Sequence, residues 1–146
     1  MSRAFVKERD DNEPEHAIPL EREPPHLVTV GGLEQLRAAA LRSSGAERAR
    51  LERRVASAVV ASPPDDTGVI AFGATVDVRD SKGKQRTYTL VGEDEVDVAH
   101  GRVGEVSPLA QALLGHRVAD VVVWQRPVGD EALTILAIGY GALRPA

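Results

Sequence analysis

The closely spaced carboxylates Glu93, Asp94, Glu95 and Asp97 are the residues whose types and spacing come closest to a chemical site in this sequence. Oxygen ligands of this kind can hold a divalent ion or a cationic partner. A regular calcium-binding loop also needs a glycine at its sharp turn and a bidentate acid at its end, and that spacing is absent. We therefore expect no metal ion or cofactor here. We interpret the segment as a solvated turn with local hydrogen bonds.

The composition excludes several other kinds of chemistry. The 146 residues contain no cysteine, which rules out disulfides, thiolate metal sites and thiol catalysis. The net charge of -4 gives no general attraction to nucleic acid or to anionic lipid. No apolar run is long enough to span a bilayer, and the 4 histidines form no ligand pair at helical spacing. We expect a soluble cytoplasmic protein that makes no membrane contact.

A short helical hairpin is predicted ahead of the acidic segment. Thr29 offers an N-cap hydroxyl, and apolar residues then recur at spacings of three and four between Leu33 and Ala40. After a break at 43–45 the same spacing returns between Leu51 and Ala58. We expect two antiparallel helices, of which the first, at roughly 13 residues, reaches only about 20 Å from its base.

A sheet-based domain follows, because from Gly68 onward the apolar period changes from about 3.6 to 2. Asp80–Gly83 has the composition of a tight turn. Ser107 as N-cap, Pro108 at the first helical position and Gly115 beyond the end predict one short helix. The expected strands cover 68–78, 87–91, 118–124 and 133–140. The chain divides into a flexible arm (1–28), the hairpin (29–62), a hinge (63–67) and a C-terminal domain (68–146).

Several motifs of the C-terminal half resemble, in order and spacing, the C-terminal domain of the GreA/GreB transcription elongation factors. They are Phe72-Gly73-Ala74-Thr75-Val76, Tyr88-Thr89-Leu90-Val91-Gly92, Asp94-Glu95, Ser107-Pro108-Leu109-Ala110, Ala112-Leu113-Leu114-Gly115 and Asp120-Val121-Val122-Val123. The resemblance implies an α+β fold, in which the short antiparallel helical hairpin precedes an FKBP-like antiparallel sheet packed on one short helix. The start of the chain, Met1 to Glu8, and the segment from Thr29 to Leu36 are similar to the GreB-type N-terminus.

The resemblance also implies a function and a partner. Gre factors bind RNA polymerase at the rim of its secondary channel, where the loop and helix around Ser107 would dock on a coiled coil. The residues implied as that docking surface are Ser107, Pro108, Leu109, Gln111 and Ala112. Alternatively, helix capping alone would explain why Ser107 and Pro108 occur at these positions. The shortened hairpin is similar to that of the regulator of nucleoside diphosphate kinase, Rnk, although the GreB-like arm departs from that subgroup.

Transcript cleavage by Gre factors depends on a pair of carboxylates at the hairpin tip, which help to hold a second magnesium ion. Here the tip, 42–47, offers Glu47 alone, and the acidic-Asn-Ala motif of the family is missing. One carboxylate on a short stub is a poor metal site, and Glu47 is also the residue type that suits a helix start. We therefore expect a non-catalytic regulator, not an enzyme. Residual cleavage through Glu47, together with an acid donated by the polymerase, remains an alternative.

Arginines concentrate on the predicted hairpin, and the resemblance makes them candidates for phosphate or polymerase contact and for indirect contact with nascent RNA. The candidates are Arg48, Arg50, Arg53 and Arg54. The alternative is a solvated helix face whose arginines pair with neighbouring acids. A second functional class, a peptidyl-prolyl isomerase, follows only from the FKBP-like fold, and fold alone does not carry function. We expect a monomer, although an exposed apolar seam on the hairpin would allow self-association.

Overall fold

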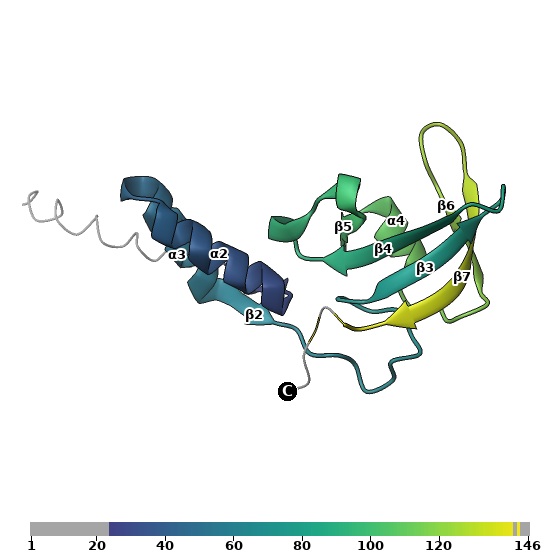
Figure 1. Ribbon diagram of the computed structural model, residues 1–146, viewed down its shortest axis with the longest axis horizontal. Helices are drawn as coiled ribbons and strands as arrows, with labels where there is room; N and C mark the ends of the chain where they lie inside the picture. The colour runs from purple at the N-terminus through teal and green to yellow at the C-terminus, as the bar shows by residue number, and fades with distance from the viewer. Residues whose placement is uncertain (1–23, 142, 144–146) are drawn as a thin grey trace, which may run out of the picture.

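The computed structural model describes residues 24–141 and Leu143, and its elements form two parts (Figure 1). A helical hairpin lies at one end, and a curled sheet with one short helix lies at the other. The α+β class predicted from the sequence is confirmed. Most of the predicted arm, 1–28, lies outside the described residues. Within the part of the chain that the structure describes, no helix is both long enough and apolar enough to cross a membrane.

The hairpin consists of α2 (Val30–Arg42) and α3 (Gly45–Ser57). As predicted, Thr29 caps α2, its side-chain oxygen accepting the backbone N–H of Gly32. Leu36 and Ala40 on α2 face Leu51 on α3 and form a small core with Val28. The apolar residues expected at the seam therefore pack within the hairpin, and Leu36 and Leu51 are not exposed.

The base of the hairpin contains a small two-stranded sheet that was not predicted. Strand β1 (His26–Val28) pairs in parallel with β2 (Ala58–Val60). Helix α3 accordingly ends at Ser57, so the last part of the region predicted as hairpin, 29–62, is not helical. The β-branched pair Val59 and Val60 favours the extended backbone, and pairing with β1 satisfies its hydrogen bonds. Residues 26–28, assigned to the flexible arm, thus belong to the folded structure.

The C-terminal sheet has the strand order β5-β4-β3-β7-β6. Its strands are β3 (Thr75–Asp80), β4 (Gln85–Val91), β5 (Arg102–Gly104), β6 (Val121–Trp124) and β7 (Glu131–Gly139). All neighbours are antiparallel except β4 and β5, which run parallel. This parallel edge pair was not expected from the sequence. It arises because the loop after β4 turns back through the short 3-10 helices η3 (Glu93–Glu95) and η4 (Val98–His100) before β5 begins.

Helix α4 (Pro108–Leu113) lies across the inner face of the sheet. Leu113 is fully buried, as are Leu90 on β4 and Leu133 and Ile135 on β7. The strand expected from Gly68 begins only at Thr75, because the preceding segment turns at Gly73, whose φ of +88° suits glycine. The predicted hinge is tied to the sheet domain by an ion pair of 2.6 Å between Asp66 and Arg117.

Candidate functional site

Helix α4 has the capped geometry that its sequence predicts. The hydroxyl oxygen of Ser107 accepts the N–H of Ala110 at 3.3 Å, and Pro108 occupies the first turn. Gly115, after the last residue of the helix, has a φ of +86°. These features fix the position of the helix on the sheet, and they also fix which of its side chains reach solvent.

The five residues predicted as a docking surface are not equally accessible. Pro108 and Gln111 are exposed, and the Gln111 amide donates to the carbonyl oxygen of Glu105 at 2.8 Å. Ser107 is half-buried at the cap, and Ala112 packs against the core. Leu109 is only 4% exposed, so its expected place among the exposed members is wrong. It lies one helical turn before Leu113 and shares the buried face of α4.

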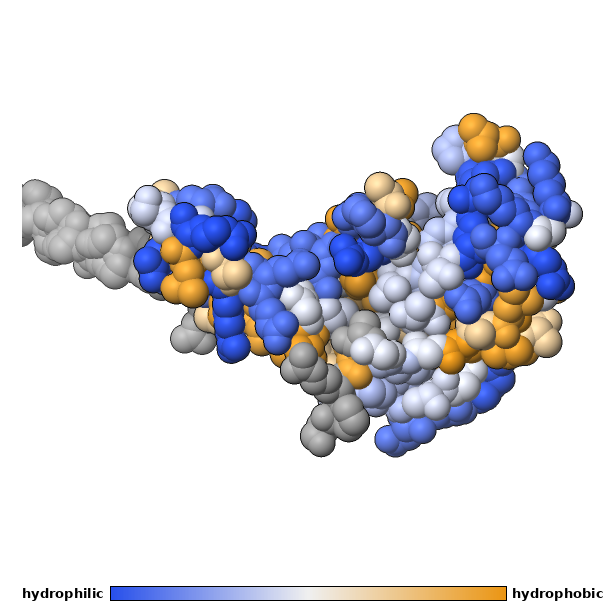
Figure 2. All heavy atoms as spheres, viewed as in Figure 1, coloured by the Kyte–Doolittle hydropathy of each residue, from blue (hydrophilic) through white to orange (hydrophobic). Residues whose placement is uncertain are grey.

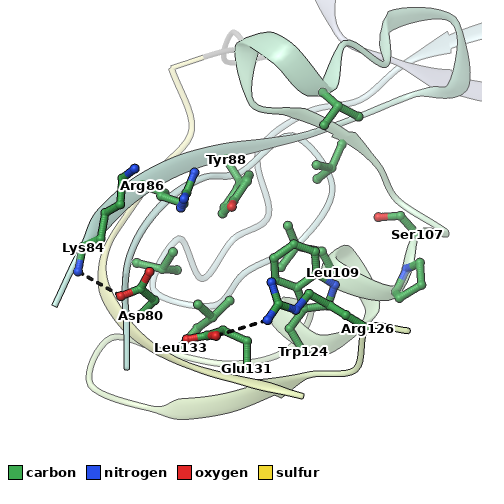
Figure 3. Close-up of a pocket in the computed structure, with 14 residues that line it drawn as sticks. Asp80, Lys84, Arg86, Tyr88, Ser107, Leu109, Trp124, Arg126, Glu131 and Leu133 are labelled. Atoms are coloured by element: carbon green, nitrogen blue, oxygen red, sulfur yellow. Dashed lines mark hydrogen bonds and ion pairs between the residues drawn. The ribbon is translucent and has the colours of Figure 1, made fainter. Parts of the chain in front are cut away.

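A groove opens beside α4, because the short helix covers only part of the inner face of the sheet (Figure 3). We call it the α4 groove. It has a volume of about 480 Å³. Its walls are Val78, Asp80, Lys84, Arg86, Tyr88, Val98, Val103, Ser107, Pro108, Leu109, Trp124, Arg126, Glu131 and Leu133. Three of the predicted docking residues, Ser107, Pro108 and Leu109, thus line one wall.

Two aromatic rings and an arginine also line the α4 groove. The rings of Tyr88 and Trp124 meet edge to face, with centroids 6.4 Å apart and planes at 72°. The guanidinium carbon of Arg126 lies 5.2 Å from the centroid of the Trp124 ring. Glu131 accepts from Arg126 at 3.3 Å. These residues were not predicted as a site, although β-strand alternation already assigns Tyr88 and Leu90 to one face.

The two carboxylates of the groove are held by hydrogen bonds from the β3–β4 turn. Backbone N–H groups of Lys84 and Lys82 donate to Asp80, both at 2.9 Å, and lower the pKa of its carboxyl. The backbone N–H and the hydroxyl of Ser81 donate to Glu131, and these bonds lower the pKa of that carboxyl. Both acids are therefore ionised at neutral pH and already bound within the chain.

The acidic segment after β4 connects the two parts of the molecule. Glu95 accepts the backbone N–H of Thr29 at 3.0 Å and also bonds the Thr29 hydroxyl. Arg54 of α3 donates to Glu93 at 2.8 Å and to Asp94 at 2.6 Å. The prediction of a solvated turn with local hydrogen bonds missed these bonds to residues distant in the sequence, although Glu93 is solvated as expected, with its side chain 74% exposed. We call the three acids the acidic clasp (Glu93–Glu95). Among the described residues, no cluster of acids and histidines is arranged to hold a metal ion.

Most of the arginines predicted to contact phosphate are ion-paired within the chain. Arg48 pairs with Glu52 at 3.0 Å and Arg50 with Glu47 at 2.9 Å. Arg54 belongs to the acidic clasp. Arg53 is exposed and forms no ion pair with a described residue. The four side chains are therefore not brought together as one basic surface, and the pairing with neighbouring acids that the sequence left open is observed.

The hairpin tip presents one carboxylate, and that carboxylate is engaged. Arg50 donates to both oxygens of Glu47, at 3.2 Å and 2.9 Å. This bidentate contact lowers the pKa of the Glu47 carboxyl, although the group is fully exposed. A metal ion at the tip would have to displace the guanidinium of Arg50.

Comparisons with known proteins agree with the fold and the motifs. The family described as "Transcription elongation factor, GreA/GreB, C-term" matches residues 64–140, more than half of the chain. Transcription elongation factor GreA of Thioalkalivibrio sulfidiphilus is 45% identical over 74 residues, which cover 50% of this chain and 47% of that protein. Transcription elongation factor GreB of Neisseria meningitidis is 38% identical over 92 residues, which cover 62% of this chain and 56% of that protein.

A solved structure, the prokaryotic transcription elongation factor GreA/GreB from Nitrosomonas europaea, covers 81% of this chain with 26% identity and a TM-score of 0.47. The chain spans about half the length of the curated relatives it matches. The match to the family model runs from the hinge through the sheet domain to Tyr140. The chain belongs to the GreA/GreB family of transcription elongation factors.

Proposed function

We propose that this protein binds RNA polymerase at the rim of its secondary channel, through the α4 groove, and regulates elongation without stimulating transcript cleavage. It would act in the cytoplasm with the polymerase. The observation that carries the proposal is the groove itself, a hollow of about 480 Å³ in the sheet domain that matches the family. Protein segments commonly dock in grooves that combine apolar surface with a few polar groups, and residues of both kinds line this groove.

We propose that the protein does not stimulate transcript cleavage because its hairpin is short and its tip carries a single carboxylate. Each of its helices has 13 residues and so extends only about 20 Å. Its tip carries Glu47 without a second acid beside it, and Arg50 holds both oxygens of Glu47. A magnesium site needs several free oxygen ligands at close range. The hairpin would therefore occupy the channel entrance and hinder longer channel-binding factors, as in the Rnk-like subgroup.

Two alternatives receive less support. Residual cleavage through Glu47 would require the carboxylate to leave Arg50. A peptidyl-prolyl isomerase would need an enclosed pocket with several converging aromatic rings, whereas Tyr88 and Trp124 are the two that line this groove. Tyr140 is engaged elsewhere, since its hydroxyl accepts the N–H of Ala71 at 2.8 Å.

The test is a binding titration of the full chain against core RNA polymerase. The groove variant is Val98→Glu/Pro108→Glu, because both side chains line the α4 groove, Val98 is 74% exposed and Pro108 is also exposed. The matched control is Val118→Glu/Val121→Glu, which adds the same charge at residues exposed by 51% and 62% near β6. The proposal expects binding by the wild type and the control, and loss of binding by the groove variant.

A cleavage assay on backtracked elongation complexes completes the test. A Gre factor with a long hairpin serves as the positive control and should lose activity when this protein is added in excess. This protein alone should leave the backtracked RNA intact. Absence of polymerase binding at micromolar concentration would overturn the proposed partner. Cleavage that the wild type stimulates and Glu47→Ala does not would overturn the non-catalytic role.

A further inference from the structure

Along strand β4, the side chains on the inner face change from buried and apolar to exposed and basic. Leu90 is buried in the core, Tyr88 is half-buried, and Arg86 is exposed. The register places Tyr88 opposite Val76 and Arg86 opposite Val78, so Tyr88 and Arg86 both share a face with core residues. The α4 groove therefore extends from an apolar floor to a basic mouth, at the end of the sheet near the β3–β4 turn.

Positive groups outnumber negative ones in the α4 groove, which Lys84, Arg86 and Arg126 line together with Asp80 and Glu131. Asp80 and Glu131 already accept hydrogen bonds from the β3–β4 turn, and Glu131 also accepts from Arg126. The side chains of Lys84 and Arg86 are exposed and form no ion pair with a described residue. Figure 2 shows hydrophilic residues gathered over this end of the molecule. The side chains of Lys84 and Arg86 are therefore accessible to a partner, and the charge of Arg86 also helps to lower the pKa of Asp80.

The other end of the groove offers apolar surface. Val98 is 74% exposed, and Pro108 and the edge-to-face pair of Tyr88 and Trp124 lie on the remaining sides. An aliphatic side chain inserted here would gain apolar contact on three sides. A nucleic-acid base would find a poorer site, because Arg126 covers one face of Trp124 and the rings meet edge to face.

We propose that the α4 groove recognises an acidic protein segment, which seats an aliphatic side chain against Tyr88 and Trp124 and places carboxylates beside Lys84 and Arg86. The inference deepens the proposed function, on which it rests, by specifying the chemistry of the polymerase segment that docks. Charge pairs at the rim of an interface act mainly on the rate of association and on partner choice, and salt screens them. The apolar contacts with Tyr88 and Trp124 would then contribute most to slowing dissociation.

The first experiment reverses charge inside and outside the groove of the same β-hairpin. Lys84→Glu/Arg86→Glu changes the mouth of the groove. Lys82→Glu/Arg79→Glu changes two exposed residues of the same turn and strand that do not line the groove, with an identical change in net charge. At low salt we expect polymerase binding to weaken by about tenfold or more for the groove pair and by less than about twofold for the control pair. The difference should shrink as ionic strength rises.

The second experiment needs no polymerase. Trp124 is the protein's single tryptophan and lines the groove, so its fluorescence reports directly on occupancy. The probes are a peptide with one leucine flanked by glutamates, the same peptide with glutamines, and a single-stranded RNA oligonucleotide. We expect a saturable change in emission with the glutamate peptide, and little or none with the other two.

The outcomes separate this inference from the proposed function. Acid recognition would be overturned if both charge-reversed pairs weakened polymerase binding equally. It would also be overturned if neither pair weakened binding while Val98→Glu/Pro108→Glu abolished it. In either case the docking role would remain intact. Equal responses to the glutamate and glutamine peptides, or a response to RNA alone, would overturn acid recognition as well. A response specific to the glutamate peptide would support the inference even if polymerase did not bind.

Discussion

Glu95 of the sheet domain caps the first helix of the hairpin, because its carboxylate accepts the backbone N–H of Thr29, 66 residues away in the sequence. The first backbone N–H groups of a helix lack partners within the helix, and a carboxylate at this end also interacts favourably with the helix dipole. Thr29 itself is only 3% exposed. The bond is therefore shielded from water, and it ties the orientation of α2 to the acidic clasp.

Removal of the Glu95 carboxylate should loosen the hairpin. Glu95→Ala leaves the Thr29 N–H without its acceptor, and we expect a loss of about 1–2 kcal/mol in the free energy of unfolding. The control is Glu93→Ala, whose side chain is 74% exposed in its pair with Arg54 and should change stability by less than about 0.5 kcal/mol. Urea unfolding followed by circular dichroism measures both. Equal effects of the two substitutions would contradict a capping role for Glu95.

The adjacent glycines of α2 should respond in opposite directions to alanine. At Gly31 a Cβ would meet nothing closer than 3.9 Å, so Gly31→Ala should stabilise the helix by about 0.5–1 kcal/mol. At Gly32 a Cβ would lie 2.2 Å from the Cδ atom of Glu95, so Gly32→Ala must displace that side chain from Thr29.

The two residues can be tested for coupling by a double-mutant cycle. In the Glu95→Ala background the obstacle at Gly32 is gone, and Gly32→Ala should then become neutral or stabilising in thermal unfolding. An unchanged penalty in that background would show that Glu95 is not the side chain that limits Gly32.

The Tyr140 hydroxyl should stabilise the start of the sheet domain. It accepts the N–H of Ala71 and donates to the carbonyl oxygen of Val69. Tyr140→Phe leaves both groups unpaired, and we expect a loss of about 1–3 kcal/mol. Tyr88→Phe is the control at neutral pH, since the Tyr88 hydroxyl forms no hydrogen bond to a described residue. A loss for Tyr88→Phe as large as that for Tyr140→Phe would refute the assigned bonds.

The same phenol predicts a dependence of stability on alkaline pH. Burial raises the pKa of Tyr140, so the folded state holds the phenolic proton more tightly than the unfolded chain does. Its contribution is complete below the ordinary pKa of about 10, and it falls as the pH rises through the folded-state pKa. Unfolding titrations above neutral pH should show a decline in the wild type that is smaller in Tyr140→Phe.

Features that depend on neighbouring residues were predictable from the sequence. Ser107, Pro108 and Gly115 specify both ends of α4, and the structure has the helix between them. The tight turn at Asp80–Gly83 forms for the same reason, since Gly83 has a φ of +85° and Asp80 accepts N–H groups of its own turn. Thr29 at the start of α2 is a third case. Propensity and local hydrogen bonding suffice at all three places.

Features that depend on distant residues were not predictable in this way. Pairing of β1 with β2 joins His26 to Ala58, and neither three-residue strand has a periodicity long enough to recognise. The acidic clasp was interpreted as solvated because its partner Arg54 lies 39 residues from Glu93. Tyr88 of β4 and Trp124 of β6 lie on strands separated by two others in the sheet, and Arg126 follows β6, so only the fold of the sheet brings the three residues together.

Strand β4 has the mouth of the α4 groove beside its first residues and is followed at once by the acidic clasp, and in Figure 1 it points toward the hairpin. Seven residues of strand correspond to about 20 Å of hydrogen-bonded backbone. The strand therefore acts as a rigid spacer between the α4 groove, which would bind a partner, and the base of the hairpin. A partner held in the groove would have the hairpin tip set at a fixed distance and direction. The depth to which the tip enters a channel would then follow from hairpin length alone.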